Sequence, residues 1–385
     1  MYIRCYHPNE TVHIGQLKKA YRMLKGAKRP LILAGGGVRI AGASGKLLEF
    51  AEKMNVPVIT TVMGKGVMPE NHPLFVGNCG MHGRFAANKA VTECDVLFSI
   101  GTRFNDRITG ELDEFAPKAK IVHVDIASAS ISRNVSVDVP VTADAGIALQ
   151  RLVEYAEKIN TEKWLDQIKK WENEHPLGMP NTKIGVCPQD ICEAINNVFP
   201  NANIVTDVGQ HKMWASQFIK LNSDQKFITS GGLGTMGFGF PAAIGAAIGD
   251  RSKPVVLITG DGGFQMNMQE MATAMSAKVP IVICIFNNSN LGMVRQMQQL
   301  FYGKRYEITD LTADDGNYYP DFLKWAESYN CKAIRVLDDN DIINALEAAR
   351  NNTNGPTVID FMVSPDDLVL PMVKGGTPLS EMILR

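Results

Sequence analysis

The sequence lacks an excess of charge of either sign and any long apolar segment. Its 385 residues carry 39 lysines and arginines against 40 aspartates and glutamates. A balance this close to neutral provides no basic surface for nucleic acid or for an anionic membrane. The longest apolar runs, such as VPIVICIF at 279–286, fall far short of the roughly 20 residues that span a bilayer. We therefore expect neither nucleic-acid binding nor a membrane span.

Cysteine is scarce and follows no pattern. The seven cysteines, at positions 5, 79, 94, 187, 192, 284 and 331, form no CxxC motif and no Cys/His group at zinc spacing. The N-terminal MYIRCYHPNE lacks the basic start, apolar stretch and cleavage site of a secretory signal. These absences favour a cytoplasmic protein with free thiols.

Apolar content is ample, and its arrangement predicts the fold class. Hydrophobic residues make up 45% of the chain and charged residues 21%, enough for two or three domains with proper cores. Two stretches alternate β-rich apolar runs with helix-period segments. The first includes PLILA, VPVIT, DVLFSIG and KIVHVDI, and the second includes NIVTDVG, KPVVLITG, VPIVICIF and PTVIDFMV. This pattern predicts an α/β protein with two doubly wound domains and mainly parallel sheets. We assign them to 1–160 and 186–385, the latter with a C-terminal tail, and a helical linker to 161–185.

A glycine-rich turn in the second stretch carries the strongest chemical signal. The strand PVVLI leads into Thr259-Gly260-Asp261-Gly262-Gly263, and a helix should follow. The glycines let backbone amides approach an anion, and the helix presents its positive end to the same point. Asp261 would repel that anion unless a cation lies between them. The next strand ends in Asn287 to Asn290, which brings oxygen ligands to the same edge of the sheet.

These residues predict a magnesium site that also holds a diphosphate. Mg²⁺ takes about six oxygens, few from protein and several from phosphate. Asp261, the amide oxygen of Asn288 and a main-chain carbonyl near Asn290 would supply three, and two diphosphate oxygens and one water the others. A glycine motif taken alone is equally compatible with a tight strand-to-helix turn. The combination of GDG, a strand before each element, and Asn288 at this spacing favours the metal site.

Further specific strings extend over nearly the whole chain. They are GGGV at 35–38, GMHG at 80–83, IGTRFNDRITG at 100–110, DVGQHKMW at 207–214, GGLGTMGFGFPAAIGA at 231–246, GDGGFQMNMQEMATA at 260–274 and LPMVKGG at 370–376. With these strings the sequence resembles the catalytic large subunit of acetolactate synthase (acetohydroxyacid synthase), a thiamine-diphosphate-dependent carboligase. The resemblance implies three cofactors: thiamine diphosphate, Mg²⁺ and FAD.

The resemblance assigns the thiamine diphosphate site to the second domain. Mg²⁺ would be held by Asp261, Asn288 and Asn290, and Met236 would support the bent shape of the cofactor. Without the family, His211 could be an exposed loop histidine and Met236 plain core packing. The implied cofactor contacts are Gly209, Gln210, His211, Gly234, Met236, Gly260, Asp261, Gly262, Gly263, Asn288, Asn290, Leu291, Gly292, Met293 and Val294.

The prediction that the chain binds FAD depends on the resemblance alone. The string GGGVRIAG at 35–42 is not the GxGxxG fingerprint, so its spacing indicates only a nucleotide-sized glycine turn. In this family the flavin plays no net redox part. The implied FAD contacts are Gly35, Gly36, Gly37, Thr61, Met81, His82, Gly83, Gly101, Thr102, Arg103, Asp106, Asp125, Ile126, Ser130 and Asp144.

Two positions concern the substrate. By resemblance Arg107 lines the substrate channel and could hold the carboxylate of a 2-oxo acid, whereas the simpler interpretation is a surface salt bridge with Asp106 or Glu111. Met297 stands where the family usually has a tryptophan that shapes the pocket for the second substrate. We therefore expect a bias toward pyruvate over 2-oxobutyrate as acceptor.

The family has three domains, and the resemblance begins at the linker into the second. We therefore expect the chain to lack the pyrimidine-binding domain, whose glutamate helps form the reactive carbanion, and we assign no catalytic residue here. That domain would come from another chain, and the resemblance implies a homo-oligomer and a regulatory small subunit as further partners.

The implied reaction decarboxylates pyruvate and ligates the hydroxyethyl carbanion to a second 2-oxo acid, which gives 2-acetolactate for branched-chain amino acid biosynthesis. Two alternatives stay open. The chain could belong to another thiamine-diphosphate carboligase, such as one acting on glyoxylate or sulfoacetaldehyde, or it could be a non-catalytic cofactor-binding fragment.

Overall fold

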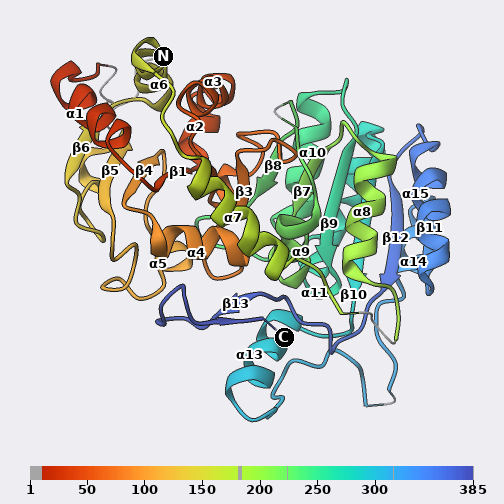
Figure 1. Cartoon of the computed structure of the whole chain (residues 1–385). Helices are drawn as coiled ribbons and strands as arrows, with labels where there is room; N and C mark the ends of the chain where they lie inside the picture. The colour runs from red at the N-terminus through yellow and green to blue at the C-terminus, as the bar shows by residue number, and fades with distance from the viewer. Residues whose placement is uncertain (1–10, 181–183, 223, 315, 385) are drawn as a thin grey trace. The chain divides into compact units, whose positions relative to one another are not determined.

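The computed structural model describes residues 11–180, 184–222, 224–314 and 316–384, and the chain divides into two compact units. The first comprises Met1–Leu177, Leu221–Ser223 and Leu370–Arg385, and the second Gly178–Lys220 and Asp224–Val369. Each unit is built on a six-stranded, all-parallel sheet with helices on both faces (Figure 1). The predicted α/β class is confirmed.

The sheet of the first unit has the strand order β3-β2-β1-β4-β5-β6. This is the order of the dinucleotide-binding fold, in which the chain reverses direction across the sheet between β1 and β4. The strands are β1 Pro30–Ala34, β2 Val58–Thr60, β3 Phe75–Asn78, β4 Val96–Ile100, β5 Lys120–Asp125 and β6 Val139–Thr142. The helices are α1 Ile14–Lys25, α2 Gly36–Ile40, α3 Ser44–Met54, α4 Phe85–Glu93, α5 Asp106–Thr109, α6 Ala145–Tyr155 and α7 Glu162–Glu174, with 3₁₀ turns η1 Val62–Gly64 and η2 Ser128–Ser130.

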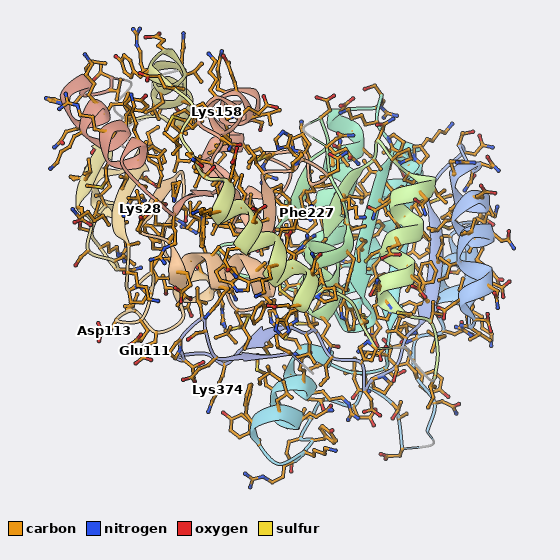
Figure 2. All side chains as sticks on the ribbon, in the orientation of Figure 1. Lys28, Glu111, Asp113, Lys158, Phe227 and Lys374 are labelled. Atoms are coloured by element: carbon orange, nitrogen blue, oxygen red, sulfur yellow. The ribbon has the colours of Figure 1, made fainter. Side chains whose placement is uncertain are left out.

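Continuous apolar strands explain why both faces of this sheet are covered. In β1, Leu31 and Leu33 point into one core cluster, and Ile32 and Ala34 point into the other. Side chains alternate across a strand, so a strand without polar positions needs a helix layer on each side. Charged residues such as Lys158, Glu111, Asp113 and Lys374 instead lie at the exposed periphery of this unit (Figure 2).

The sheet of the second unit has the order β11-β12-β10-β9-β7-β8. Its direction reverses between β7 and β9, because β8 lies beside β7 at the edge and the chain then returns to the other side of β7. The strands are β7 Asn203–Thr206, β8 Phe227–Thr229, β9 Val255–Gly260, β10 Ile281–Asn287, β11 Lys332–Val336 and β12 Thr357–Met362. The helices are α8 Pro188–Val198, α9 Gln210–Phe218, α10 Gly239–Gly249, α11 Asp261–Gln265, α12 Met271–Ala277, α13 Gly292–Phe301, α14 Phe322–Ser328 and α15 Ile342–Arg350, with 3₁₀ turns η3 Met268–Glu270 and η4 Asp339–Asp341.

An aromatic cluster fills one face of this sheet. Phe264 lies at its centre, with ring centroids 5.3 Å from Phe240, 5.8 Å from Phe322 and 5.3 Å from Trp325. Phe227 on β8 is likewise buried (Figure 2). The six cysteines that the structure describes are free and buried, and Cys5 lies outside the described residues. No helix within the described ranges is long and apolar enough to cross a bilayer.

The division into units differs from the predicted domains at two segments. The predicted linker contains α7, which belongs to the first unit: Trp164 is buried and its Nε1 donates to the Pro30 carbonyl at 2.9 Å. The tail, assigned to the second domain, also belongs to the first unit. There Val373 N donates to the Met81 carbonyl at 2.8 Å, and β13 Met372–Val373 pairs with β14 Met382–Ile383. The amphipathic pattern of a segment predicts that one face is buried, but it does not identify the domain against which that face packs.

Candidate cofactor sites

The residues predicted for thiamine diphosphate all lie beyond the carboxyl ends of strands in the second unit. They follow β7, β8, β9 and β10, which places them around the point where the strand order reverses. Parallel α/β sheets bind ligands at this edge because helix N-termini and loop amides converge there. The topology thus brings together loops that are far apart in the sequence.

Asp261 begins α11 directly after β9 and is 2% exposed. Its Oδ2 atom has no hydrogen-bond partner among the described residues. Burial raises the pKa of the Asp261 carboxyl to about 7; the negative charge of Asp360 adds to this increase, and backbone N–H groups, including that of Ser289, oppose it. A buried carboxylate with an unpaired oxygen is poised to bind a cation.

The loop after β10 adds amide oxygens beside this carboxylate. Asn288 Oδ1 accepts from Asn290 N at 3.0 Å, and Asn290 Nδ2 donates to the Asn288 carbonyl at 2.9 Å. Asn290 Oδ1 is buried and has no partner in the described part of the chain. Ser289 between them has a φ of 55°, a conformation that costs free energy and recurs at functional sites. The structure thus places Asp261 beside the Asn288–Asn290 loop.

His211 is buried rather than exposed, which removes the loop-histidine alternative. Burial lowers the pKa of His211 to about 4, and the nearby Asp207 only partly offsets this. A Cβ atom at Gly260 would lie 2.9 Å from His211 Nδ1, and one at Gly209 would lie 2.7 Å from its Cε1. Glycine at both positions therefore makes room for a neutral imidazole at the sheet edge.

Asp207, which the sequence did not single out, holds the loop that carries Met236. Its carboxylate accepts from Gly237 N at 3.1 Å and from Gly239 N at 2.8 Å. Met236 itself is 37% exposed, so it is not a core methionine. Its Cε would lie 3.9 Å from a Cβ at Gly262. A carboxylate directly after a strand was a usable signal for Asp207, but its partners lie 30 residues or more along the chain.

A buried charged group supports the asparagine loop from the neighbouring strands. Asp360 on β12 is fully buried, accepts from Asn287 Nδ2 at 3.0 Å and pairs with Arg335 Nε at 3.0 Å. Asn287 Oδ1 in turn accepts from Ser289 N at 3.1 Å. The run TVIDFM contained a detectable signal for this group, because a carboxylate inside an apolar strand is buried only when it is paired.

The segment after α13 folds back over the same loops. Leu291 N donates to the Thr309 carbonyl at 2.8 Å, and Leu311 N donates to the Ser289 carbonyl at 2.9 Å. Further along, Tyr318 Oη accepts from Gln265 at 2.7 Å and lies within hydrogen-bonding reach of Asp261, and burial raises its pKa. Apolar and aromatic side chains thus border the buried carboxylate.

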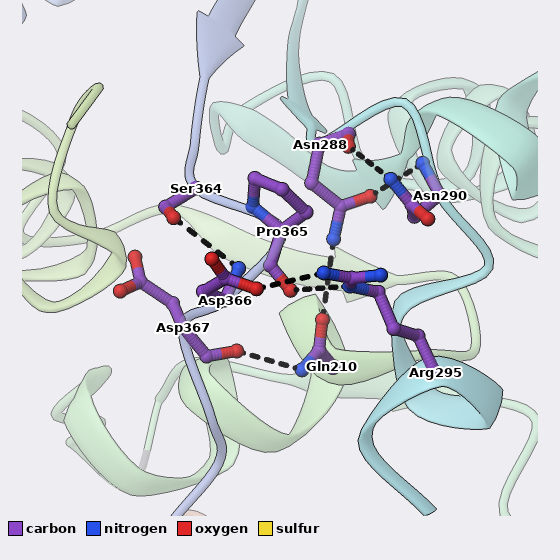
Figure 3. A network of polar contacts seen from close by, with 8 residues as sticks. All are labelled: Gln210, Asn288, Asn290, Arg295, Ser364, Pro365, Asp366 and Asp367. Atoms are coloured by element: carbon purple, nitrogen blue, oxygen red, sulfur yellow. Dashed lines mark hydrogen bonds and ion pairs between the residues drawn. The ribbon is translucent and has the colours of Figure 1, made fainter. Parts of the chain in front are cut away.

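Helix α13 carries the remaining predicted residues. Gly292 begins the helix, Met293 and Met297 are half-buried, and Val294 is 50% exposed. Arg295 anchors the helix: it pairs with Asp366 at 2.7 Å and donates to the Pro365 carbonyl at 3.1 Å (Figure 3). Its guanidinium also stacks on Tyr306.

In the first unit, the residues predicted for FAD also lie at the carboxyl ends of β1 to β6. The loops after β1 and β4, on either side of the reversal point, touch backbone to backbone. Gly37 N donates to the Gly101 carbonyl at 3.0 Å, and a Cβ at Gly35 would lie 2.1 Å from that oxygen. Gly101 has a φ of 63°. Only glycine permits these two loops to approach so closely.

His123 and Asp125 lie on β5 beside the switch-point crevice, our name for the place outside the carboxyl ends of β1 and β4 where doubly wound sheets bind ligands. His123 Nε2 is 2.8 Å from the Thr102 carbonyl and 3.8 Å from Asp125 Oδ2. Burial lowers the pKa of His123 and raises the pKa of Asp125. Thr102 Oγ1 is buried and lacks a partner among the described atoms, so the crevice keeps an unsatisfied hydroxyl group.

Other predicted residues of this unit hold the fold in place. Thr61 Oγ1 accepts from Gly64 N at 3.1 Å, and Asp144 caps α6 by accepting from Gly146 N at 2.8 Å. Met81 to Gly83 follow β3, Ile126 follows β5, and Ser130 ends η2. These positions fit the edge of the crevice but have structural roles that the sequence did not reveal.

Arg107 makes the surface contact that the simpler interpretation foresaw. Its side chain is 66% exposed and lies 3.9 Å from Asp106, which is 79% exposed. Arg107 Nη1 is 3.5 Å from the sulfur of Met81, and burial lowers the pKa of the neighbouring His82 to about 4. An exposed pair of this kind contributes little to stability.

Comparison with known families decides the classification. Residues 17–152 match the central domain of thiamine pyrophosphate enzymes, and residues 207–361 match their C-terminal domain, which binds thiamine pyrophosphate. The chain belongs to the thiamine pyrophosphate enzymes. The central-domain match covers the first sheet, and the C-terminal match covers the loops around Asp261.

Within this family of thiamine pyrophosphate enzymes, the chain is similar to acetolactate synthase large subunits. It is 44% identical over 396 residues to the probable large subunit of Methanococcus aeolicus, 45% over 388 residues to that of Methanocaldococcus jannaschii and 43% over 384 residues to the large subunit of Corynebacterium glutamicum. Each alignment covers 98% of this chain but 65%, 64% and 61% of the respective relative. The chain therefore spans less than two thirds of these relatives.

In both units, the described residues of this chain are of the kinds that the expected cofactors require. In the second, the unpaired Asp261 oxygen and neighbouring amide oxygens are hard ligands suited to Mg²⁺. A Cβ at Gly262 would lie 3.0 Å from Leu291, so glycine opens the backbone at the helix start to a diphosphate. In the first, the glycine-lined crevice and the unsatisfied Thr102 hydroxyl suit a dinucleotide.

Proposed function

We propose that this chain is the flavin- and diphosphate-binding portion of an acetolactate synthase. The observation that carries the proposal is the buried Asp261 carboxylate, whose Oδ2 atom has no hydrogen-bond partner among the described residues, beside the Asn288–Asn290 loop at the reversal point of the second sheet. Such a carboxylate at a glycine-rich helix start is of use only with a cation that offsets it. The similarity to acetolactate synthase large subunits supports the choice of reaction.

In the proposed enzyme, Asp261, Asn288 and the carbonyl of Asn290 hold Mg²⁺. Gly262, Gly263 and the amides of Leu291 to Val294 receive the diphosphate, and Met236 supports the bent cofactor. Bound thiamine diphosphate supplies the carbanion chemistry that decarboxylates pyruvate and joins the remaining two-carbon unit to a second 2-oxo acid, which gives 2-acetolactate. FAD occupies the crevice of the first unit and takes no net part in the redox balance.

Substrate selection is proposed for two residues. The exposed guanidinium of Arg107 holds the carboxylate of a 2-oxo acid through its planar pair of donors. Met297, half-buried on α13, replaces the bulky ring usual in the family and leaves the acceptor pocket biased toward pyruvate.

The proposed setting is a cytoplasmic homo-oligomer that works in branched-chain amino acid biosynthesis. A pyrimidine-binding domain on another chain supplies the glutamate that helps generate the carbanion, and a regulatory small subunit is a further partner.

Purified chain incubated with thiamine diphosphate, Mg²⁺, FAD and pyruvate tests this function. Acetolactate should form only when a pyrimidine-binding chain is added, and Asp261→Asn should abolish it. Acetolactate from the chain alone would refute the need for a second domain. Product from glyoxylate or sulfoacetaldehyde instead of pyruvate would favour another carboligase, and tight cofactor binding with no product under any condition would favour a non-catalytic binding protein.

A further inference from the structure

Gln210 has both ends of its side-chain amide bonded to protein (Figure 3). Its Nε2 donates to Gln296 Oε1 and to the Asp367 carbonyl, each at 2.9 Å. Its Oε1 accepts from Asn288 Nδ2 at 3.2 Å. Both N–H bonds of the amide are thereby used, and its oxygen faces Asn288.

The direction of this chain of amides is fixed by the backbone. Val369 N can only donate, and it donates to Gln296 Oε1 at 2.8 Å; the Val369 carbonyl can only accept, and it accepts from Gln296 Nε2 at 3.1 Å. Gln296 therefore cannot be flipped without two unfavourable contacts. The Asp367 carbonyl fixes Gln210 in the same way, because it requires a donor.

The fixed direction of Gln210 determines the orientation of the Asn288 side-chain amide. With Gln210 Oε1 facing it, Asn288 must turn its NH₂ group toward Gln210 and its oxygen toward Asn290. An amide oxygen has two lone pairs, and Asn290 N–H uses one. The other is left for a cation.

We propose that Gln296 and Gln210 form an amide relay that orients the oxygen of Asn288 toward a divalent cation. The relay rests on the proposed function, since it presumes that Asn288 is a metal ligand. Gln296 is the first member, is 1% exposed and is two hydrogen bonds away from Asn288. Both glutamines are positioning residues and neither touches the cation.

The space around the relay supports this role independently. A Cβ atom at Gly292 would lie 2.0 Å from Gln210 Oε1 and 2.6 Å from Asn288 Nδ2. The start of α13 is thus pressed against the junction of the two amides. Any side chain there would push them apart, so the glycine permits the relay as well as the approach of backbone amides to a ligand.

The test measures Mn²⁺ binding to the full chain by electron paramagnetic resonance at saturating thiamine diphosphate, without turnover. Q296M keeps the length of the side chain but removes both polar ends, and should weaken Mn²⁺ binding about tenfold or more, as removal of partners behind metal ligands does. Q296E retains the acceptor that faces Gln210 and Val369 N and, as a buried carboxyl group that keeps its proton, also a donor for the Val369 carbonyl. It should stay within about threefold of the wild type. Q150M, the same change as Q296M at an exposed position of α6 in the first unit, should change nothing.

The ordering of the two Gln296 variants separates the relay from simple packing. A packing role would tolerate the apolar Q296M better than the buried polar carboxyl group of Q296E, which is the reverse order. Wild-type Mn²⁺ affinity in folded Q296M would overturn the relay. Should thermal unfolding show that Q296M does not fold, Q210M replaces it with the same expectation. A wild-type chain that binds no Mn²⁺ with thiamine diphosphate would overturn the proposed function together with the relay. Equal Mn²⁺ binding by the wild type and Q296M would overturn the relay alone.

Discussion

The two sheets of this protein build their candidate sites in different ways. In the first unit, the crevice forms where backbone meets backbone: the loops after β1 and β4 touch through Gly35, Gly37 and Gly101. In the second, the sheet edge is assembled from side chains: Asp261 is buried with its Oδ2 atom lacking a partner among the described residues, and the amides and carboxylates behind it are bonded in fixed directions.

This difference matches what the two proposed ligands would require. A dinucleotide is large, and the protein must mainly make room for it and offer backbone groups. A metal–diphosphate centre is small and strongly charged, so each oxygen must point correctly and each buried charge must be balanced. Substitutions should therefore abolish ligand binding in the first unit mainly through steric clashes, and in the second mainly by misorienting an oxygen ligand or removing a charge.

The largest expected effect is the loss of the metal site in Asp261→Asn. The substitution removes the carboxylate that a cation would neutralise, so Mn²⁺ affinity at saturating thiamine diphosphate should fall by about 100-fold or more. FAD binding, followed by flavin fluorescence, should be unchanged. Loss of both ligands would contradict the separation of the two sites.

Gly35→Ala should damage the first unit through its fold. The new Cβ would lie 2.1 Å from the Gly101 carbonyl oxygen, which is backbone and cannot swing aside. We expect a loss of stability of about 2 kcal/mol or more and loss of FAD binding, with Mn²⁺ binding retained. Gly45→Ala is the matched control, because its Cβ would meet no atom within 4 Å; an equal loss in both variants would reject the steric explanation.

The charge of Asp261 should also appear in the pH dependence of stability. The pKa of its carboxyl is about 7 in the folded chain, above the ordinary aspartate value of 3.8, so the folded state binds the proton more tightly. The stability from this group is present at low pH and is lost as pH rises from about 4 through about 7. Without metal, the wild type should lose roughly 2 kcal/mol more than Asp261→Asn between pH 5 and pH 8. Urea unfolding in a chelator measures this; parallel curves would contradict the assigned pKa.

Gly292→Ala should show the opposite behaviour to Gly35→Ala. Its Cβ would meet the ends of two side chains, Gln210 and Asn288, which can move. Thermal stability should stay within a few degrees of the wild type, while Mn²⁺ affinity should fall about tenfold because the Asn288 oxygen is no longer oriented. A Gly292→Ala variant that is strongly destabilised but binds Mn²⁺ with wild-type affinity when folded would contradict this difference between the two glycines.

The smallest effect is expected at Met297. Met297→Trp adds a larger apolar ring to the proposed acceptor pocket. The two acceptors differ by one methylene, and contact with it should change discrimination by about 10-fold, the lower end of the range for one methylene. In a mixture of pyruvate and 2-oxobutyrate, the reconstituted enzyme should shift toward acetohydroxybutyrate. Strong enrichment of acetohydroxybutyrate by the unmodified protein would refute the expected pyruvate bias.

Much of the fold could be predicted because both domains repeat the same local pattern, an apolar β-rich run followed by a loop and a helix-period segment. Continuous apolar runs such as 281–286 predicted buried parallel strands, and the loops after them carried the motifs. The helix expected after Gly263 is instead broken into α11, a 3₁₀ turn and α12, and Asn267 at the break donates to the Gly237 carbonyl at 2.8 Å. A tertiary hydrogen bond of this kind overrides helix periodicity and leaves no mark in the local pattern.

Candidate ligands were easier to predict than the residues that hold them. Asp261 and Asn288 stand at strand ends with neighbouring glycines, whereas Gln296 lies mid-helix in VRQM with nothing to distinguish it from its neighbours. Its partners, Gln210 and Val369, are 86 and 73 residues away in the chain. Only the folded arrangement reveals that its amide has a defined direction.

Simultaneous titration of the purified chain with FAD and with Mn²⁺ plus thiamine diphosphate tests the central claim most directly. We predict one flavin site and one metal site per chain, with neither ligand displacing the other. Displacement of flavin by thiamine diphosphate, or a single variant that removes both sites, would contradict it.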